Sequence, residues 1–286
     1  MKGIILAGGH GSRLHPITIP YSKQLIPVFD KPLIYYPLST LMNLNITEIL
    51  IILKANQKNN FKTLLGNGHH LGLNIKYAIQ ENPNGIAESF LIGKKFINND
   101  SVALILGDNI FYGQDFLKFS NIKEKIIGGT IFLYEVKKAS QYGVAKIKNN
   151  KLISIIEKPN KPISNLAVTG LYIYDNDVVS LVKKLKPSKR QELEITDLNN
   201  LYIKNEKLNY IKLDSSAAWF DAGTPSSLLL ASQYVQAIQE RNNSVISSPE
   251  QVALEKKFIN KNQFLRLIQN KGGNSYYNTL KALLKK

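Results

Sequence analysis

The chain has 286 residues, of which 44% are hydrophobic and 20% charged, a composition that excludes a disordered or fibrous protein. It contains no cysteine, which excludes disulfides and thiolate metal sites. Its net charge of +16 comes mostly from scattered lysines, because arginine occurs at only four positions. Guanidinium groups are the side chains best suited to reading guanine edges and gripping a phosphate backbone, so no nucleic-acid partner is expected.

The first half of the chain alternates apolar runs with helix-like stretches. The apolar runs predict strands at 3–7, 48–54, 74–80, 102–107 and 130–137. The stretches between them predict helices at 34–44, 60–65, 86–96 and 116–126. Strands separated by helices indicate βαβ units. We therefore expect an α/β fold with a Rossmann-like, mainly parallel mixed sheet flanked by helices on both faces.

The second half keeps strand and helix patterns and then becomes helical. Strands are predicted at 143–147, 152–157, 167–174 and 210–213, and helices at 176–185 and 195–205. Thr224 followed by Pro225 is typical of an N-cap and a first-turn proline, which predicts a helix to about Arg241. Further helices are expected at 261–269 and 275–284. The chain is thus predicted to have a core at 1–225 and a C-terminal helical extension at 226–286.

A glycine-rich turn, Gly8 to Arg13, directly follows the first predicted strand. Ligands of parallel α/β sheets collect at the carboxyl ends of the strands. Glycines let the backbone approach a phosphate, and Arg13 adds a forked cation. A P-loop is excluded because the turn ends in Gly11-Ser12-Arg13, and the dinucleotide fingerprint is excluded because its third glycine is replaced by Leu14. A phosphate site is favoured over a purely structural turn.

Two carboxylates are candidates for a metal site. Asp108 ends an apolar strand, where a carboxylate is costly unless it meets water or a cation, although a turn-capping role is the alternative. Asp221 is flanked by large apolar residues. Two carboxylates together with phosphate oxygens and water suit Mg²⁺. The residues alone do not pair two positions that lie more than a hundred residues apart.

Further motifs accompany the glycine-rich turn. They stand at 22–28, 31–41, 106–113, 157–159, 167–172 and 192–197. With these motifs the chain resembles the sugar-nucleotide pyrophosphorylase family from residue 1 to about 270, and within it the glucose-1-phosphate thymidylyltransferases. The resemblance implies a nucleotide-diphospho-sugar transferase type of fold and a Mg²⁺-dependent enzyme.

The resemblance also implies roles for individual residues. The catalytic set would be Arg13, Lys23, Asp108, Lys158 and Asp221, with Mg²⁺ bound by Asp108 and Asp221. The nucleotide would be bound by Gly8, Gly9, Gly11, Ser12, Arg13, Lys23, Gln24, Gln80, Gly85 and Asp108. The sugar phosphate would be bound by Asn109, Gly143, Glu157, Lys158 and Val168.

The activity implied is transfer of a thymidylyl group from dTTP to glucose 1-phosphate, with release of pyrophosphate, in dTDP-rhamnose and cell-surface polysaccharide biosynthesis. The family's usual assembly is a homotetramer. Because no run approaches the roughly 18 apolar residues of a spanning helix and the start lacks signal-peptide features, we expect no membrane partner and a cytoplasmic location. The alternatives are the same reaction with UTP or another sugar 1-phosphate, and a non-catalytic sugar-nucleotide-binding regulatory subunit.

The chain departs from the family pattern at several positions. His10 stands where the family usually has a small residue, and its effect on the nucleotide is open. Ser216 and Glu255 stand where the family has arginines at a second, regulatory nucleotide site between subunits. Ser216 removes one positive charge, and Glu255 replaces another by a negative charge. Both changes should weaken binding of an anionic inhibitor, so we expect reduced feedback inhibition by dTDP-rhamnose.

Overall fold

The computed structural model describes residues 1–113, 126–269 and 271–285 and is organised around one mixed sheet. Within these residues the sheet has nine strands, ordered β10-β9-β11-β6-β1-β4-β5, with β8 against β11 and β12 against β8. The parallel part consists of β1 (Lys2–Ala7), β4 (Glu48–Leu53), β5 (Asn74–Ile79) and β6 (Val102–Leu106). The remainder consists of β8 (Gly129–Glu135), β9 (Gly143–Lys148), β10 (Lys151–Glu157), β11 (Leu166–Tyr174) and β12 (Leu208–Lys212). The predicted mixed, mainly parallel α/β sheet is confirmed.

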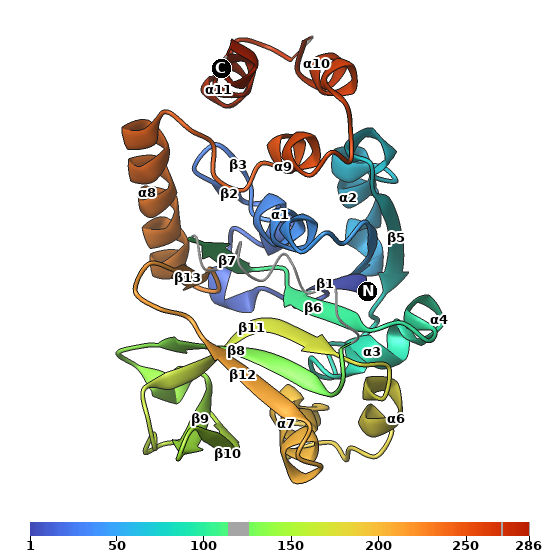
Figure 1. Cartoon of the computed structure of the whole chain (residues 1–286), viewed down its shortest axis with the longest axis vertical. Coiled ribbons are helices and arrows are strands. Elements are labelled where there is room, and N and C mark those ends of the chain that lie inside the picture. The colour runs from blue at the N-terminus through green and yellow to red at the C-terminus, as the bar shows by residue number, and fades with distance from the viewer. Residues whose placement is uncertain (114–125, 270, 286) are drawn as a thin grey trace.

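Helices cover the sheet on both sides (Figure 1). One side carries α1 (Tyr35–Asn43), α2 (Lys58–Leu65), α9 (Pro249–Glu255), α10 (Lys261–Gln269) and α11 (Ser275–Ala282). The other side carries α3 (Glu88–Ile92), α4 (Lys94–Ile97), α6 (Val178–Val182) and α7 (Ile195–Lys204). The long α8 (Pro225–Asn242) runs along one end of the parallel strands. No helix among the described residues is long and apolar enough to cross a membrane.

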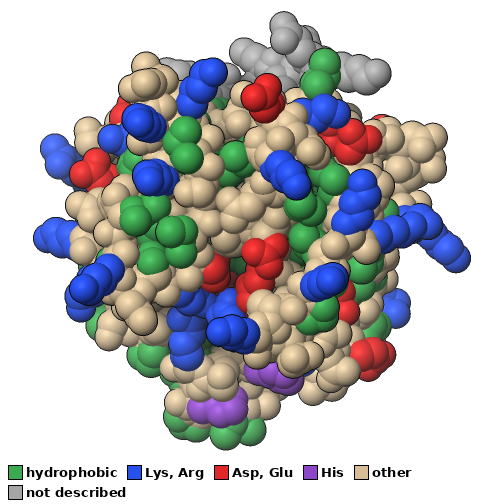
Figure 2. Space-filling view, turned by 90° about the horizontal axis from the view of Figure 1, so that it is seen from below, with side chains coloured by type: hydrophobic (Ala, Val, Ile, Leu, Met, Phe, Trp, Pro, Cys, Tyr) green, Lys and Arg blue, Asp and Glu red, His purple; other side chains and the backbone are tan. Residues whose placement is uncertain are grey.

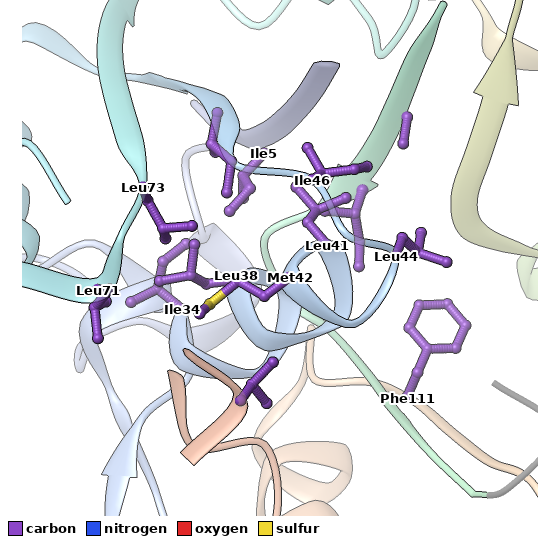
Figure 3. Packing of buried hydrophobic residues seen from close by; sticks show 14 of the residues in the cluster. Ile5, Ile34, Leu38, Leu41, Met42, Leu44, Ile46, Leu71, Leu73 and Phe111 are labelled. Atoms are coloured by element: carbon purple, nitrogen blue, oxygen red, sulfur yellow. The ribbon is translucent and has the colours of Figure 1, made fainter. Parts of the chain in front are cut away.

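The core strands are buried on both faces because successive side chains of a strand point to opposite sides. In β1, Ile5 joins the cluster under α1 and α2, whereas its neighbour Ile4 joins the cluster against α3, α6 and α7. Figure 3 shows Ile5 packed with Leu38, Leu41 and Met42 of α1. This arrangement explains why β1, β4 and β6 read as nearly continuous apolar runs rather than as alternating ones.

The structure corrects one predicted helix and adds elements that the pattern did not indicate. The stretch 86–96 is divided at Gly93 into the short helices α3 and α4, and a side chain at Gly93 would meet Ile4 of β1 at 2.9 Å. The helix α9 was not predicted. Two small two-stranded sheets were not predicted either: β2 (Pro27–Val28) with β3 (Lys31–Pro32), and β7 (Asn109–Tyr112) with β13 (Ala218–Asp221). The helix predicted at 116–126 lies outside the described residues except for its last position.

The start of α8 follows the predicted signal. Thr224 accepts a hydrogen bond from the backbone N–H of Ser227, and Ser227 accepts one from the N–H of Thr224. Pro225 opens the helix, where a missing backbone donor carries no penalty. This reciprocal capping fixes where the chain leaves β13 (Ala218–Asp221) and the helical C-terminal part begins.

A buried lysine joins the C-terminal helices to the β2–β3 hairpin (Pro27–Val28 and Lys31–Pro32). Lys31 is 3% exposed, and its Nζ donates to Asp30 at 2.7 Å and to Gln239 of α8 at 2.9 Å. The same ammonium lies 4.9 Å from the ring centre of Tyr36 and 5.6 Å from that of Tyr276 in α11. A buried charge persists only when it is paired, so this network ties α8 and α11 to the core.

Apolar packing of α10 leads to a stability prediction. Phe264 is fully buried in the same cluster as β1 and α1, whereas the adjacent Leu265 is 37% exposed. Replacing Phe264 by Ala should therefore lower the free energy of unfolding by about 3–5 kcal/mol, because it leaves a cavity. Leu265→Ala is the control and should change stability by much less in the same urea titration. Equal effects of the two replacements would mean that α10 does not share the core.

Candidate active site

Four polar segments meet at the carboxyl edge of the parallel strands. The registers pair Ala7 with Leu53, Leu53 with Ile79 and Leu6 with Leu106, so the four strands end at nearly the same level. The residues that follow them are Gly8, Lys54, Gln80 and Gly107-Asp108. The glycine-rich turn and the first candidate metal ligand are thus neighbours because β1 and β6 are adjacent strands, as expected for a ligand site of a parallel sheet.

The glycine-rich turn is shaped by close contacts. A Cβ on Gly8 would lie 2.2 Å from Oε1 of Gln80, which is itself 4% exposed and donates to Glu88 at 2.7 Å. Gly11 has a φ of 66°, a left-handed conformation that glycine adopts without strain, and its carbonyl accepts a hydrogen bond from Thr18 at 2.7 Å. These contacts fix the backbone of the turn before Arg13. The side chain of Arg13 is exposed and lines the pocket described below.

A short two-stranded sheet brings the two candidate metal ligands together. β7 (Asn109–Tyr112) pairs antiparallel with β13, and this register places Asp221 opposite Asn109. The backbone N–H of Ala222 also donates to the carbonyl of Asp108 at 2.9 Å. Asp108 and Asp221 therefore lie together although 113 positions separate them in sequence. No local pattern contains this pairing.

The two carboxylates are surrounded by cations. Lys23 forms an ion pair with Oδ2 of Asp108, while Oδ1 accepts from Asn109 at 3.1 Å. Burial alone would raise the pKa of Asp108, but Lys23 holds it below its usual range. Burial and the nearby charge of Asp108 raise the pKa of Asp221 to about 6, against the opposing influence of Lys23 and Arg13. The two carboxylates are thus buried near each other, with cations close to both.

The donor set fits Mg²⁺ rather than a metal held in an all-protein cage. Among the residues that the structure describes, no group of three or more His, Cys, Asp or Glu side chains could hold a metal ion. Two adjacent carboxylates would supply part of an octahedral shell and leave the rest to phosphate oxygens and water, which is how Mg²⁺ usually binds. A divalent cation at the two carboxylates would offset their mutual repulsion.

Asn109 is almost completely buried and orients its neighbours. Its Oδ1 accepts from Trp219 Nε1 at 2.6 Å and from the backbone of Gly170 at 3.1 Å, and its Nδ2 donates to Asp108. The side chain lines the pocket, as expected from the resemblance, but most of its bonding capacity is used inside the protein. Its observed action is to fix the carboxylate of Asp108.

The predicted sugar-phosphate side forms the opposite wall. Glu157 ends β10 opposite Gly143 of β9, and its carboxylate accepts from Thr196 at 2.6 Å. Lys158 has a φ of 41°, a strained conformation for a residue with a side chain, and its ammonium lies 3.7 Å from Glu157. Lys158 is half exposed and also lowers the pKa of Asp221, so it faces the carboxylates across the pocket.

Eight of the sixteen predicted site residues line one pocket of about 220 Å³. They are Arg13, Asp108, Asn109, Gly143, Glu157, Lys158, Val168 and Asp221. Lys23 reaches this pocket through its ion pair with Asp108, and Gln24 packs against Gly107 beside it. Gly9 and Ser12 line a neighbouring pocket instead, while Gln80 and Gly85 line neither. Figure 2 shows carboxylates gathered in a hollow with lysine, arginine and histidine side chains beside them.

Sequence reasoning missed a second arginine of this pocket. Arg190 donates to Glu194 through Nη2 at 2.9 Å and lies 3.6 Å from Glu157. It is one of only four arginines in the chain, and that rarity was the available signal. Thr196, which follows in α7, and Trp219 also belong to the lining. Their positions depend on the packing of α7 and β13, which no motif spacing reveals.

Comparisons with known proteins identify the family. The family model described as nucleotidyl transferase matches residues 2–238. The chain belongs to the nucleotidyl transferase family. A protein of Neisseria meningitidis named glucose-1-phosphate thymidylyltransferase is 46% identical over 288 residues, covering 100% of both chains. A protein of Mycolicibacterium smegmatis with the same name is 47% identical, covering 92% of each chain.

Solved structures support the same grouping within the nucleotidyl transferase family. A Bacillus anthracis protein described as a glucose-1-phosphate thymidylyltransferase, solved in complex with sucrose, has a TM-score of 0.75 and 43% identity. This match covers 82% of the present chain and 94% of the other. A UDP-glucose pyrophosphorylase complexed with UDP-glucose has a TM-score of 0.73 and 25% identity, covering 83% and 98%. The thymidylyltransferase and the uridylyl-type enzyme thus share this fold.

The contact between Gly8 and Gln80 can be tested through stability. Gly8→Ala should lower the free energy of unfolding by about 1–3 kcal/mol, because the anchored Gln80 leaves no room for a methyl group. Gly9→Ala is the matched control, since nothing lies within 4 Å of its Cβ position. A Gly8→Ala protein as stable as the wild type in urea would show that Gln80 moves freely.

Proposed function

We propose that the chain transfers a thymidylyl group from dTTP to α-D-glucose 1-phosphate, yielding dTDP-glucose and pyrophosphate. The observation that carries this proposal is the pocket that Asp108 and Asp221 line together with Lys158 and Glu157, and to which the glycine-rich turn contributes Arg13. Such an arrangement suits two anionic substrates that must approach each other. The named relatives among the glucose-1-phosphate thymidylyltransferases support the choice of substrates.

In the proposed reaction a phosphate oxygen of glucose 1-phosphate attacks the α-phosphorus of dTTP. A new P–O bond forms, the bond to the β-phosphate oxygen breaks, and pyrophosphate leaves in line with the attack. Both partners are anionic, so positioning and neutralisation of charge account for most of the rate. The attacking oxygen is ionised at neutral pH and needs no general base.

The residues divide this work between two sides of the pocket. Lys158 would hold the phosphate of the sugar, and Glu157, fixed by Thr196, would accept hydrogen bonds from sugar hydroxyls. Arg13 would hold the triphosphate. Mg²⁺ bound by Asp108 and Asp221 would neutralise phosphate oxygens of the nucleotide. Lys23 would then pass from Asp108 to the phosphates, because its ion pair occupies one carboxylate oxygen in the present structure.

Pyrophosphate release tests the reaction directly. The pure protein is mixed with Mg²⁺, glucose 1-phosphate and each nucleoside triphosphate in turn. We expect release with dTTP and slower release with UTP, since one methyl group gives only about 1–3 kcal/mol of discrimination. Asp108→Asn should reduce turnover by at least about a hundredfold with an unchanged circular dichroism spectrum. Asp100→Asn, which alters an exposed carboxylate, is the control and should leave turnover unchanged. No pyrophosphate release by the wild type with any nucleotide would refute the proposal.

A second pocket, of about 560 Å³, bears on regulation. Ser216 and Glu255, which replace arginines of the family's regulatory site, both line it, together with Gly113, Ser247 and Gln251. Neither of the two supplies positive charge for an anionic ligand. We therefore propose that this pocket has lost much of its affinity for a nucleotide inhibitor.

Inhibition by dTDP-rhamnose measures this loss. The wild type should retain most of its activity at micromolar inhibitor. The double variant Ser216→Arg and Glu255→Arg should be inhibited at concentrations at least about tenfold lower, since each guanidinium restores charge-assisted hydrogen bonds. Strong inhibition of the wild type at micromolar dTDP-rhamnose would contradict the proposal.

A further inference from the structure

A pocket of about 410 Å³ adjoins the glycine-rich turn and is separate from the pocket of the carboxylates. The two pockets meet at the turn itself, because Ser12 lines the first and the next residue, Arg13, lines the second. They meet again at Ser22, which lines the first and precedes Lys23, the partner of Asp108. A ligand held at Arg13 and Asp108 can therefore extend past the turn into the larger pocket.

The lining of this pocket is basic. No aspartate or glutamate is among its lining residues, whereas Lys54, His10 and His15 are. Lys54 follows β4 at the same edge of the sheet at which the glycine-rich turn follows β1. Gly9 also lines the pocket, and no atom lies within 4 Å of the position where its Cβ would be. The backbone of the turn is therefore open to a ligand at this point.

His10 and Lys54 contact each other. The Nζ of Lys54 lies 2.5 Å from Nδ1 of His10. A lysine ammonium can only donate, so Nδ1 accepts and the ring carries its hydrogen on Nε2. This arrangement leaves the Nε2–H and two ammonium hydrogens free to bind a ligand. Two basic side chains in contact are stabilised by an anion that both can reach.

We propose that Lys54 and His10 bind the β- and γ-phosphates of the nucleoside triphosphate in this pocket, and equally pyrophosphate in the reverse reaction, Lys54 through its ammonium and His10 through its Nε2–H. The proposal rests on the proposed function, which places the α-phosphate at Arg13 and the two carboxylates. The base is not the occupant, because Gln80 and Gly85, the candidates for contact with the ring, do not line the pocket. His10 and Lys54 then both bind pyrophosphate, the leaving group of the reaction.

Inorganic tripolyphosphate is a probe of this pocket that contains no base or sugar and requires no turnover. Its binding to the full chain with Mg²⁺ is measured by calorimetry. Lys54→Ser and His10→Ser should each weaken binding about threefold to tenfold, the effect of removing one partly exposed charged or polar ligand. Lys62→Ser removes an exposed lysine of α2 that does not line the pocket and should change binding less than twofold. Binding by Lys54→Ser and His10→Ser within twofold of the wild type would overturn the proposal.

Kinetics of the reverse reaction separate this proposal from the proposed function. Lys54→Ser should raise KM for pyrophosphate about threefold to tenfold, while KM for dTDP-glucose changes less than twofold. A protein that binds tripolyphosphate through Lys54 but transfers no thymidylyl group would refute the proposed function and leave the pocket assignment intact. A change in the preference for dTTP over UTP, with unchanged tripolyphosphate binding, would instead place the base in this pocket and overturn the proposal.

Discussion

Two buried carboxylates at one edge of a parallel sheet constrain the whole site. Burial of Asp221, together with the repulsion between it and Asp108, raises the pKa of Asp221. The site is stable only because cationic side chains surround it, above all Lys23 on Asp108. Two carboxylates that lie near each other would also suit a divalent cation with phosphate oxygens. The stability of this cluster of charges and the proposed chemistry therefore have one electrostatic origin.

The fold supplies this arrangement through strand order and one added pairing. Adjacent parallel strands carry the glycine-rich turn and Asp108 to the same edge, and the β7–β13 pair adds Asp221. The chain then enters α8, whose Gln239 is fixed to the β2–β3 hairpin through buried Lys31. That hairpin follows Lys23 and Gln24 closely. The helical C-terminal part thus packs against the segments that bear the site, and it shares hydrophobic clusters with them.

Charge is distributed unevenly around the glycine-rich turn. Acidic residues and their partners gather on the side of Asp108, where Arg190 is paired with Glu194 and lies near Glu157. The side of Lys54 has no acidic lining. An extended polyanion that crosses the turn would meet the two carboxylates on one side and Lys54, with no acidic lining residue, on the other. Although lysine is scattered along the chain, which has a net charge of +16, positive charge beside the glycine-rich turn favours an anionic ligand there.

The sequence by itself determined the parallel strands, the capped start of α8 and the loop at Gly8, because each depends on local periodicity, capping or backbone freedom. The motifs also indicated the family and eight of the residues that line the pocket. Tertiary structure decided the pairing of Asp108 with Asp221 and the contact of His10 with Lys54, since each joins segments that only strand order brings together. It also decided the break at Gly93 and the place of Arg190, which depend on packing between elements rather than on any spacing along the chain.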